Sequence, residues 1–317
     1  MNLKKEYNKF QRDIFIKTLQ DFAIRDKKII LISNDQGAPA LDDFKKKIPK
    51  QFINAGISEQ NIISVAAGLA KEGYNCFVYS IASFILYRAF EQIKIDLCSM
   101  NLPVKIIGVG SGYSYAVDGP THHATEDIGI LNILPNIHIY SPSDSYLTMR
   151  IAKAVISEKS PVYLRLDREL CPEIYNRNPF KNFSKGFCEL VKGKTACIIS
   201  TGKMVSRALE ISNEFPHHSI AVVDLYKIKP LNHGIISIFK KYKTIFCLEE
   251  HSEVGGIGSI LLDFLNKNSL RNKVKFLKLG LKQKYIFGYG SRNFLHEKHL
   301  IDKKKLKKII FQQISKK

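Results

Sequence analysis

Glu59 opens a segment whose other side chains are mostly apolar or very small. It follows Asn54-Ala55-Gly56-Ile57-Ser58 and precedes the run Ile62-Ile63-Ser64-Val65-Ala66-Ala67-Gly68-Leu69-Ala70. An acid at a helix start ordinarily interacts with the helix dipole, for roughly 0.3–1 kcal/mol. The helix predicted here has almost no polar face, so we expect it to be buried with its acid. A buried carboxyl can stay protonated and serve as a hydrogen-bond donor or proton shuttle. Both the structural and the functional role remain open for Glu59.

The densest polar cluster lies between Gly108 and Asp127. It contains Gly110, Ser111, Gly112, Asp118, Gly119, Pro120, Thr121, His122, His123, Glu126 and Asp127. This long loop follows a predicted strand, and ligands of open α/β sheets bind at the carboxyl ends of strands. Long loops without structure of their own are more often functional than not. The loop is therefore a candidate binding site.

Two familiar chemistries fit this loop poorly. A metal site could be built from Asp118, His122, His123 and Glu126, but adjacent histidines point in different directions and no third histidine or cysteine is near. The run Gly108-x-Gly110-x-Gly112 lacks the third glycine of a dinucleotide fingerprint and opens no helix. A second glycine run, residues 255–258, instead predicts a helix start that approaches another backbone closely.

An apolar and aromatic stripe, Ile81-x-x-Phe84-x-x-Tyr87, stands at a predicted strand-to-helix junction. A spacing of three at a helix start puts these side chains on one face. The stripe can be an ordinary core contact. It can also form a flat apolar slot for a planar heterocycle, which needs one stacked face and one hydrogen-bonded edge.

Short apolar runs alternate with amphipathic segments along the chain, which predicts two doubly wound α/β domains. In the first domain we expect strands at residues 28–33, 76–79, 104–110, 137–140 and 161–166, and helices at residues 12–23, 84–100 and, capped by Ser143, 143–157. Asp35 then falls at the carboxyl end of a strand. A polar linker is predicted at residues 175–185, between domains at residues 1–174 and 186–317.

Composition narrows the class of protein. At 317 residues with 45% hydrophobic and 25% charged side chains, the chain is long enough for about two globular domains. It has no apolar run of the roughly 18 residues that span a bilayer and no signal-peptide pattern. Six cysteines without a C-x-x-C pair indicate free thiols, and therefore the cytoplasm. The net charge of +20 comes from dispersed lysines without an aromatic-interleaved basic stripe, so we expect no nucleic-acid partner.

Taken together, the motifs resemble the second half of the transketolase family of thiamine-diphosphate enzymes. The matching segments are residues 54–61, 66–70, 81–87, 118–123, 134–136 and 142–144, followed by Ser200-Thr201-Gly202, residues 228–231 and Glu249-Glu250-His251-x-x-x-Gly255-Gly256-x-Gly258. The resemblance covers nearly the whole chain. It implies a pyrimidine-binding domain followed by the family's C-terminal domain.

The resemblance also implies a role for each site. Glu59 would hydrogen-bond the cofactor's aminopyrimidine and favour the imino form that removes the proton from thiazolium C2. The pyrimidine would lie against Phe84 and Tyr87, near Ile57, Ile81 and Asp35. Asp118 and His122 would bind hydroxyls or the developing oxyanion of the donor sugar. Arg12 and Arg168 fall near positions that hold the substrate's phosphate.

The sequence departs from the family pattern in two respects. The Gly-Asp-Gly…Asn motif that binds the diphosphate and Mg²⁺ belongs to the family's N-terminal half and does not occur in these 317 residues. The resemblance therefore implies a second polypeptide, which carries the metal, in an α2β2 assembly. The phosphate-binding histidine of transketolases is replaced by Gly110, and a serine by Pro39. These changes favour a ketol transfer in a specialised sugar pathway, such as the synthesis of surface-polysaccharide precursors.

Three alternatives remain open. A deoxyxylulose-phosphate synthase shares the pattern Tyr87-Arg88-Ala89-Phe90-Glu91-Gln92. The β-subunit of a 2-oxo acid dehydrogenase shares the fold and the helix-opening acid, but a small oxo acid does not need the hydroxyl partners offered by Asp118 and His122. A regulatory or nucleic-acid-binding protein on the same fold would not need an intact Glu59.

Overall fold

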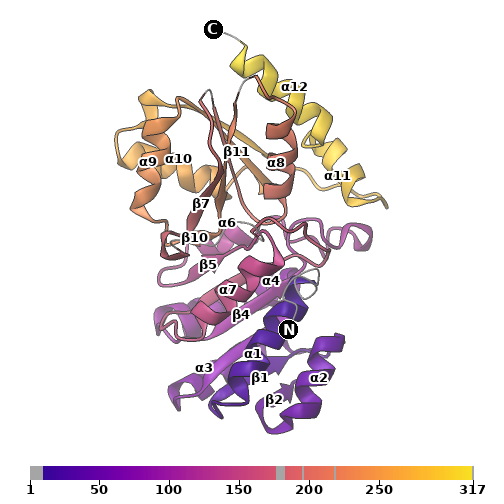
Figure 1. Ribbon diagram of the computed structural model, residues 1–317. Helices are drawn as coiled ribbons and strands as arrows, with labels where there is room; N and C mark the ends of the chain where they lie inside the picture. The colour runs from indigo at the N-terminus through magenta and orange to yellow at the C-terminus, as the bar shows by residue number, and fades with distance from the viewer. Residues whose placement is uncertain (1–9, 176–182, 195, 218, 316–317) are drawn as a thin grey trace, which may run out of the picture.

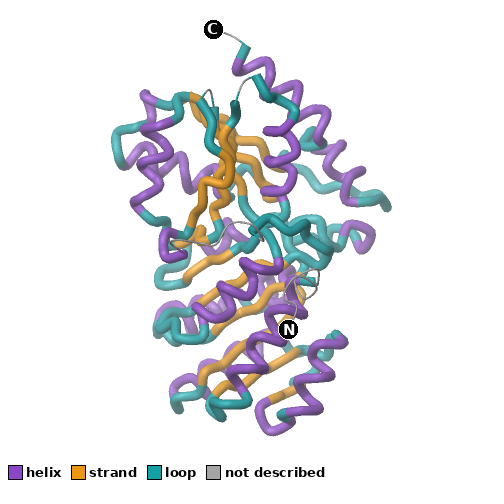
Figure 2. The backbone as a smooth tube through the Cα atoms, in the orientation of Figure 1, coloured by secondary structure: helices purple, strands orange, loops and turns teal. Residues whose placement is uncertain are grey.

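The computed structural model describes residues 10–175, 183–194, 196–217 and 219–315. Two β-sheets stand one above the other, and each is covered by helices on both faces (Figure 1, Figure 2). Residues 176–182 of the predicted linker lie outside the described residues. In the described part of the chain, no helix has the length and apolar character needed to cross a membrane. The chain is thus an α/β protein with two sheets, as predicted.

The first sheet has seven strands, six of them parallel. Their order is β10 (Lys227–Lys229), β5 (His138–Tyr140), β6 (Val162–Leu166), β4 (Lys105–Val109), β3 (Asn75–Ile81), β1 (Ile29–Ser33) and β2 (Phe52–Asn54). The antiparallel edge strand β10 comes from the second half of the chain and pairs with β5. The two halves are therefore joined by backbone hydrogen bonds as well as by side chains.

Helices on each face of this sheet bury separate apolar clusters. One face carries α1 (Gln11–Ala23), α2 (Pro39–Lys47) and α7 (Ser145–Val155). The other carries α3 (Glu59–Lys71), α4 (Ala82–Arg88), the short α5 (Phe90–Gln92), a π-helical turn (Ile93–Ser99) and α6 (Asp127–Asn132). The single helix predicted at residues 84–100 is wrong, because the backbone leaves helical geometry at Ala89 and resumes as a separate turn.

The second sheet has five strands in the order β12 (Lys275–Leu281), β11 (Thr244–Ser252), β8 (Cys197–Ser200), β9 (Ala221–Leu225) and β7 (Phe187–Val191). Only β7 runs antiparallel to its neighbour. Helices α9 (Ile236–Lys241) and α10 (Ile257–Lys267) cover one face, while α8 (Met204–Asn213), α11 (Arg292–His299) and α12 (Lys303–Ile314) cover the other. One apolar cluster continues from the first sheet into the second, so the two layers share a core.

Two local predictions need correction. The N-cap of α7 is Asp144, whose Oδ1 accepts a hydrogen bond of 2.7 Å from the Leu147 amide, while the Ser143 hydroxyl donates to Asp224. Helix α3 is not buried all round: Ser64, Val65 and Gly68 form an exposed strip along it. Small and apolar residues in the sequence therefore mark a solvent-facing surface in this chain, as well as a core face.

Candidate active site

Glu59 is the first residue of α3 and leads into the interior, as predicted. Strand β2 ends at Asn54, whose Oδ1 accepts a hydrogen bond from the Gly56 amide at 3.1 Å. Gly56 has φ +69°, a conformation that favours glycine, and it turns the chain into the helix. The Glu59 side chain is 5% exposed. The tight turn is thus what carries a carboxyl group under the surface.

Arg88 supplies a counter-charge to Glu59, which the sequence had not suggested. Its Nη1 donates a hydrogen bond of 2.8 Å to Glu59 Oε1 from the last turn of α4. The guanidinium also lies 4.4 Å from the ring centroid of Phe84, within cation–π range. Within the described part of the chain, Glu59 Oε2 has no hydrogen-bond partner. One oxygen of the buried carboxylate therefore remains available to a ligand.

A chain of ring contacts joins Phe84 to Arg168. The ring of Phe84 meets His122 edge-on at 4.8 Å between centroids, and His122 lies 5.7 Å from Tyr115. Tyr115 in turn packs under the Arg168 guanidinium, 4.6 Å from its ring centroid. The predicted site residues Glu59, Phe84, His122 and Arg168 thus lie along one continuous surface, linked by Arg88 and Tyr115.

Tyr115 also explains why the chain has glycine at position 110. A Cβ atom on Gly110 would lie 2.2 Å from Cε2 of Tyr115, and the residue adopts φ +100°. No larger side chain fits there without displacing the ring. The ring of Tyr115 therefore occupies the space that a side chain at position 110 would need.

Arg12 and Arg168 line one cavity of about 470 Å³ beside this surface. Its other lining residues are Phe10, Ser114, Ala116, Val117, Glu169, Ser291 and Arg292. Arg12 lies at the start of α1 and Arg168 just after β6, so two segments far apart in the sequence place cations at one opening. Planar guanidinium groups suit a phosphate or carboxylate. The predicted pair of arginines is brought together.

The two adjacent histidines face different surroundings. His122 is half-buried, and its Nδ1 is 3.0 Å from the Thr121 hydroxyl. His123 is buried, with Nε2 3.3 Å from the Ala116 carbonyl and its ring edge-on to Tyr113 at 4.7 Å. Burial lowers the pKa of His123, although the hydrogen bond to Ala116 opposes the change. Only His122 faces the surface shared with Phe84, while Asp118 is exposed at the end of a short 3₁₀ helix (Ala116–Asp118).

The remaining predicted residues lie at the margin of the Glu59–Arg168 surface. Asp35 is exposed and accepts a hydrogen bond of 3.0 Å from Asn54, and Ile57 is 79% exposed. The Ile81 amide donates to Gln36 Oε1 at 2.9 Å. The Tyr87 hydroxyl donates to Glu126 Oε2 at 2.9 Å, so Tyr87 contacts the loop between Gly108 and Asp127, which we call the polar loop. The predicted stripe at residues 81, 84 and 87 therefore meets several different neighbours.

A buried ionic network that the sequence analysis missed holds the polar loop against the second sheet. Arg292 pairs with Asp167 at 2.7 Å and with Glu250 at 2.5 Å. Glu250 Oε2 also accepts a hydrogen bond of 3.0 Å from the amide of Tyr113, in the polar loop. A Cβ on Gly112 would lie 2.0 Å from the same oxygen. The sequence signal for this network was the run of polar residues Glu249-Glu250-His251, which follows an apolar strand and is buried in β11.

The glycine run after β11 serves a helix cap. Glu249 accepts hydrogen bonds from the amides of Ile257 and Gly258, at 2.7 and 2.9 Å, at the start of α10. A Cβ on Gly256 would lie 2.1 Å from Glu249 Oε2, and a Cβ on Gly255 would lie 3.0 Å from the Gly129 backbone. The expected close approach of this helix start to another backbone is thus confirmed.

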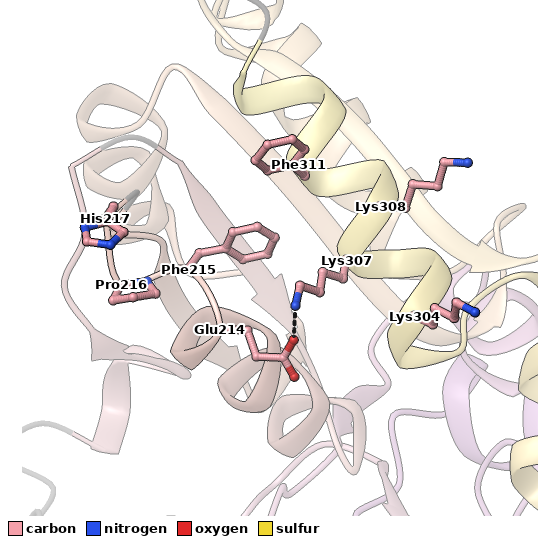
Figure 3. Close-up of a pocket in the computed structure, with 8 residues that line it drawn as sticks. All are labelled: Glu214, Phe215, Pro216, His217, Lys304, Lys307, Lys308 and Phe311. Carbon is pink, nitrogen blue, oxygen red and sulfur yellow. Dashed lines mark ion pairs between the residues drawn. The ribbon is translucent and has the colours of Figure 1, made fainter.

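A separate groove lies between α8 and α12 (Figure 3). It has a volume of about 540 Å³ and is lined by Glu214, Phe215, Pro216, His217, Lys304, Lys307, Lys308 and Phe311. The rings of Phe215 and Phe311 stack at 6.3 Å, and Glu214 pairs with Lys307 at 2.6 Å. None of the predicted site residues lines it, so we place the candidate active site at the Glu59–Arg168 surface.

Comparison with known proteins agrees with this architecture. Residues 11–173 match the family described as Transketolase, pyrimidine binding domain, and residues 188–305 match Transketolase, C-terminal domain. The chain is 34% identical over 261 residues to one subunit of the apulose-4-phosphate transketolase of Phocaeicola vulgatus, covering 81% of this chain and 84% of the relative. It is 33% identical to the 1-deoxy-D-xylulose-5-phosphate synthase of Caldanaerobacter subterraneus, covering 95% of this chain and 48% of that relative.

A solved structure extends the likeness to the whole fold. The structure described as a split gene transketolase, inactive beta4 tetramer, has a TM-score of 0.85 and 29% identity. The alignment covers 96% of this chain and 98% of the solved one, so the two chains have the same extent. The order of the two matched domains is the one expected from the sequence. The chain belongs to the transketolase family and carries its pyrimidine-binding and C-terminal domains.

Proposed function

We propose that this chain is the C-terminal subunit of a two-polypeptide transketolase, which transfers a two-carbon ketol unit between sugars or sugar phosphates. The observation that carries the proposal is the continuous surface from the buried Glu59, past Phe84 and His122, to Arg168. A carboxylate, an aromatic face, a hydrogen-bonding imidazole and a guanidinium follow one another there. These are the groups that a heterocyclic cofactor and a phosphorylated ketose require, in that order.

The donor set of this surface fits the aminopyrimidine of thiamine diphosphate. Glu59 Oε2 is available to accept a hydrogen bond from a ring nitrogen, and the half-buried ring of Phe84 offers a flat apolar contact. Arg88 is half-exposed, so its guanidinium can leave the ring of Phe84 when the cofactor arrives. When bound, thiamine diphosphate supplies the carbon nucleophile of the transfer. Glu59 would hold the proton on the ring nitrogen, and Ile57, Ile81 and Tyr87 would border the ring.

The sugar then lies between the polar loop and the two arginines. His122 donates a hydrogen bond to the oxygen where charge develops, and Asp118 accepts hydrogen bonds from hydroxyl groups of the donor. Arg12 and Arg168 bind the phosphate at the far end of the cavity that they line. Binding at that end orients the carbonyl carbon toward Phe84 and Glu59.

A partner polypeptide completes the site. The Gly-Asp-Gly…Asn motif for diphosphate and Mg²⁺ does not occur among the 317 residues, and the relative from Phocaeicola vulgatus is itself one subunit of a larger enzyme. Ile57 is 79% exposed next to Glu59, and Val65 continues the exposed strip on α3. An apolar surface beside a buried acid suits a protein partner that closes over it. The proposed assembly is α2β2, with Mg²⁺ held by the partner.

The proposed compartment rests on the cysteines, and the proposed class of sugar rests on the name of a relative. All six cysteines are free, which suits the reducing cytoplasm. The name of the relative from Phocaeicola vulgatus contains a specialised sugar phosphate, apulose 4-phosphate, which supports a substrate apart from the common pentose phosphates. The dispersed lysines supply no nucleic-acid footprint.

A deoxyxylulose-phosphate-synthase activity is the second candidate, because a synthase from Caldanaerobacter subterraneus is 33% identical over 306 residues. The two activities differ in their donor. A synthase consumes pyruvate and releases carbon dioxide, whereas a transketolase consumes a ketose and releases none.

The test combines this chain with the subunit that carries the diphosphate motif, thiamine diphosphate and Mg²⁺. With a ketose donor and an aldose acceptor, the mixture should form a shortened aldose and a lengthened ketose, and each subunit alone should form neither. Pyruvate with the same acceptor is run in parallel. Carbon dioxide release from pyruvate without ketose cleavage would replace the proposed activity by the synthase activity.

A further inference from the structure

Three aromatic side chains stand almost free on the loop between β12 and α11. Tyr285, Phe287 and Tyr289 are 68%, 84% and 93% exposed, whereas Ile286 between them packs against the apolar cluster of the second sheet. In Figure 1 this gold segment, just before α11, reaches the right-hand edge of the molecule. Ile286 thus ties the loop to the core, while the three aromatic side chains stay on the surface.

The loop is held at both ends by contacts with its neighbours. The amide of Lys282 donates to His299 Nδ1 at 3.1 Å, and its ammonium group pairs with Glu253 at 2.6 Å. At the other end, the Ser291 hydroxyl accepts a hydrogen bond from the Phe294 amide as the cap of α11. The rings of Tyr285 and Phe287 meet edge-on at 6.4 Å. Anchored ends limit the backbone freedom that the loop would lose on binding.

The exposed area is large for an unused surface. Rings of this size bury about 150–250 Å² each when covered, so the three together offer roughly 500 Å². A standard protein interface covers about 800 Å² on each partner, and exposed apolar patches of several hundred Å² ordinarily mark a binding surface. The three rings, which we call the aromatic loop surface, therefore fit the centre of a protein interface.

The position of this surface identifies which side of the molecule is covered. Tyr285 lines a cavity of about 290 Å³ together with Tyr113, Thr125 and Glu126 of the polar loop. Glu126 accepts the hydrogen bond from Tyr87, next to Phe84 and the candidate site. The aromatic loop surface is therefore continuous with the rim of the active site, where the proposed partner must approach.

The positive charge of the chain favours the proposed partner over a second copy of this chain as the occupant of this surface. The chain carries a net charge of +20, and the exposed Lys284 directly precedes Tyr285, whereas Lys282 is paired with Glu253. Two copies that meet at this surface would bring like charges together, which opposes association. A partner with an apolar patch rimmed by carboxylates would be attracted.

We infer that the aromatic loop surface docks the diphosphate-binding partner subunit through an apolar, acid-rimmed face of that subunit. The inference rests on the proposed function, because it takes the partner of the two-polypeptide enzyme as the occupant. It adds a contact in the C-terminal domain to the one expected at α3. The C-terminal domain then helps to hold the two halves of the active site together.

The test measures assembly separately from catalysis. The full chain and a Phe287→Ser/Tyr289→Ser variant are each titrated with the diphosphate-binding subunit in an isothermal calorimeter. We expect the variant to raise the dissociation constant at least about tenfold, the lower range for interface aromatic residues. Its melting temperature and its turnover at saturating partner should equal those of the unchanged chain. A Phe311→Ser variant, which removes a ring from the groove of Figure 3, should leave the dissociation constant unchanged.

A Lys284→Glu variant tests the charge of the rim. It should slow association most at low salt, because screening weakens exposed charge pairs as ionic strength rises.

An unchanged dissociation constant for the double variant would overturn the inference. So would a loss of self-association alone, which would make a second copy the occupant. If the subunits assemble tightly and the variant weakens them, but no ketol unit is transferred, the docking surface stands and the proposed function fails. Wild-type subunits that do not assemble would contradict both.

Discussion

Arg88 Nη1 donates a hydrogen bond of 2.8 Å to Glu59 Oε1, and the two residues come from the facing ends of different helices. Glu59 is almost completely buried, whereas the Arg88 side chain is half-exposed. One guanidinium therefore contacts both the acid and the ring of Phe84. A ligand that stacks on the ring face covered by Arg88 has to displace this guanidinium, which also removes the hydrogen bond to Glu59 Oε1.

Glu59→Gln should nearly abolish exchange of the C2 proton of thiamine diphosphate in the assembled enzyme. An amide cannot hold a proton on the ring nitrogen as a carboxylate does, so we expect a fall of about 10²–10⁴-fold. Proton exchange followed by NMR in deuterated buffer measures the rate. Glu72→Gln, at the exposed C-cap of α3, is the control. Exchange at the full rate in Glu59→Gln would disprove the role of this residue.

Arg88→Leu should lower the free energy of unfolding by about 1–2 kcal/mol, because it leaves a buried carboxylate without its counter-charge. The combined Glu59→Gln/Arg88→Leu variant should lose less than the sum of the two single changes, because the charge that needed a partner is gone. Urea unfolding of the four proteins completes the cycle. Additive losses would mean that the pair contributes nothing to stability.

Arg168→Gln should raise KM for a phosphorylated donor by about 10–100-fold and leave kcat within a few-fold, because a phosphate contact far from the reacting carbon acts on binding. Arg12→Gln should act in the same direction, since both guanidinium groups line one cavity. An unphosphorylated ketose should show no such change. Arg25→Gln, exposed just after α1, is the matched control. An equal rise in KM for phosphorylated and unphosphorylated donors would show that this cavity does not bind the phosphate.

Asp224 should make the protein less stable as pH rises. Burial raises its pKa to about 7, although hydrogen bonds from Ser143 and Tyr175 oppose the change. An unfolded aspartate releases its proton near pH 4. Between about pH 4 and 7 the folded chain therefore holds one proton more than the unfolded chain, and the stability falls by about 1.4 kcal/mol per pH unit.

Asp224→Asn should remove the contribution of Asp224 to the fall in stability with rising pH. Urea unfolding at intervals between pH 5 and 8 measures the slope for both proteins. Glu249 also makes the protein less stable as pH rises, because burial raises its pKa to about 8, although hydrogen bonds from the Gly258 and Ile257 amides oppose the change. The variant should therefore keep a residual slope, and an undiminished slope would show that Asp224 does not hold the proton.

Arg292→Met should cost about 3–5 kcal/mol, because it strands two buried carboxylates at once. Burial would raise the pKa of Asp167, but the charge of Arg292 holds it below its usual value. Arg292→Lys should lose less, since an ammonium group keeps the charge but cannot span both acids with a planar fork. Thermal unfolding checks the order of the three proteins. A melting temperature of Arg292→Met close to that of the unchanged chain would mean that the network is not a structural clamp.

The outline of the fold follows from local patterns. Buried strands such as Ile29–Ser33 and Val162–Leu166 appear as apolar runs, and the helix at Lys303–Ile314 buries Leu306 and Ile310. Strand β10 was not predictable in this way. It has three residues, of which only the central Ile228 is buried, and it pairs across the boundary between the two halves of the chain, so the pairing depends on how these halves meet.

The amino-acid sequence by itself determined the residue types of the site and their order: an acid at a helix start, an aromatic residue after a strand, a histidine-rich loop, and two arginines, one at a helix start and one after a strand. These depend on short spacings along one chain. Only the tertiary structure decided that Arg88 pairs with Glu59, that Tyr115 occupies the space over Gly110, and that Arg292 joins Asp167 to Glu250. Each of these contacts joins different helices, strands or loops, and its energy exists only when the sheets and helices have packed and excluded water.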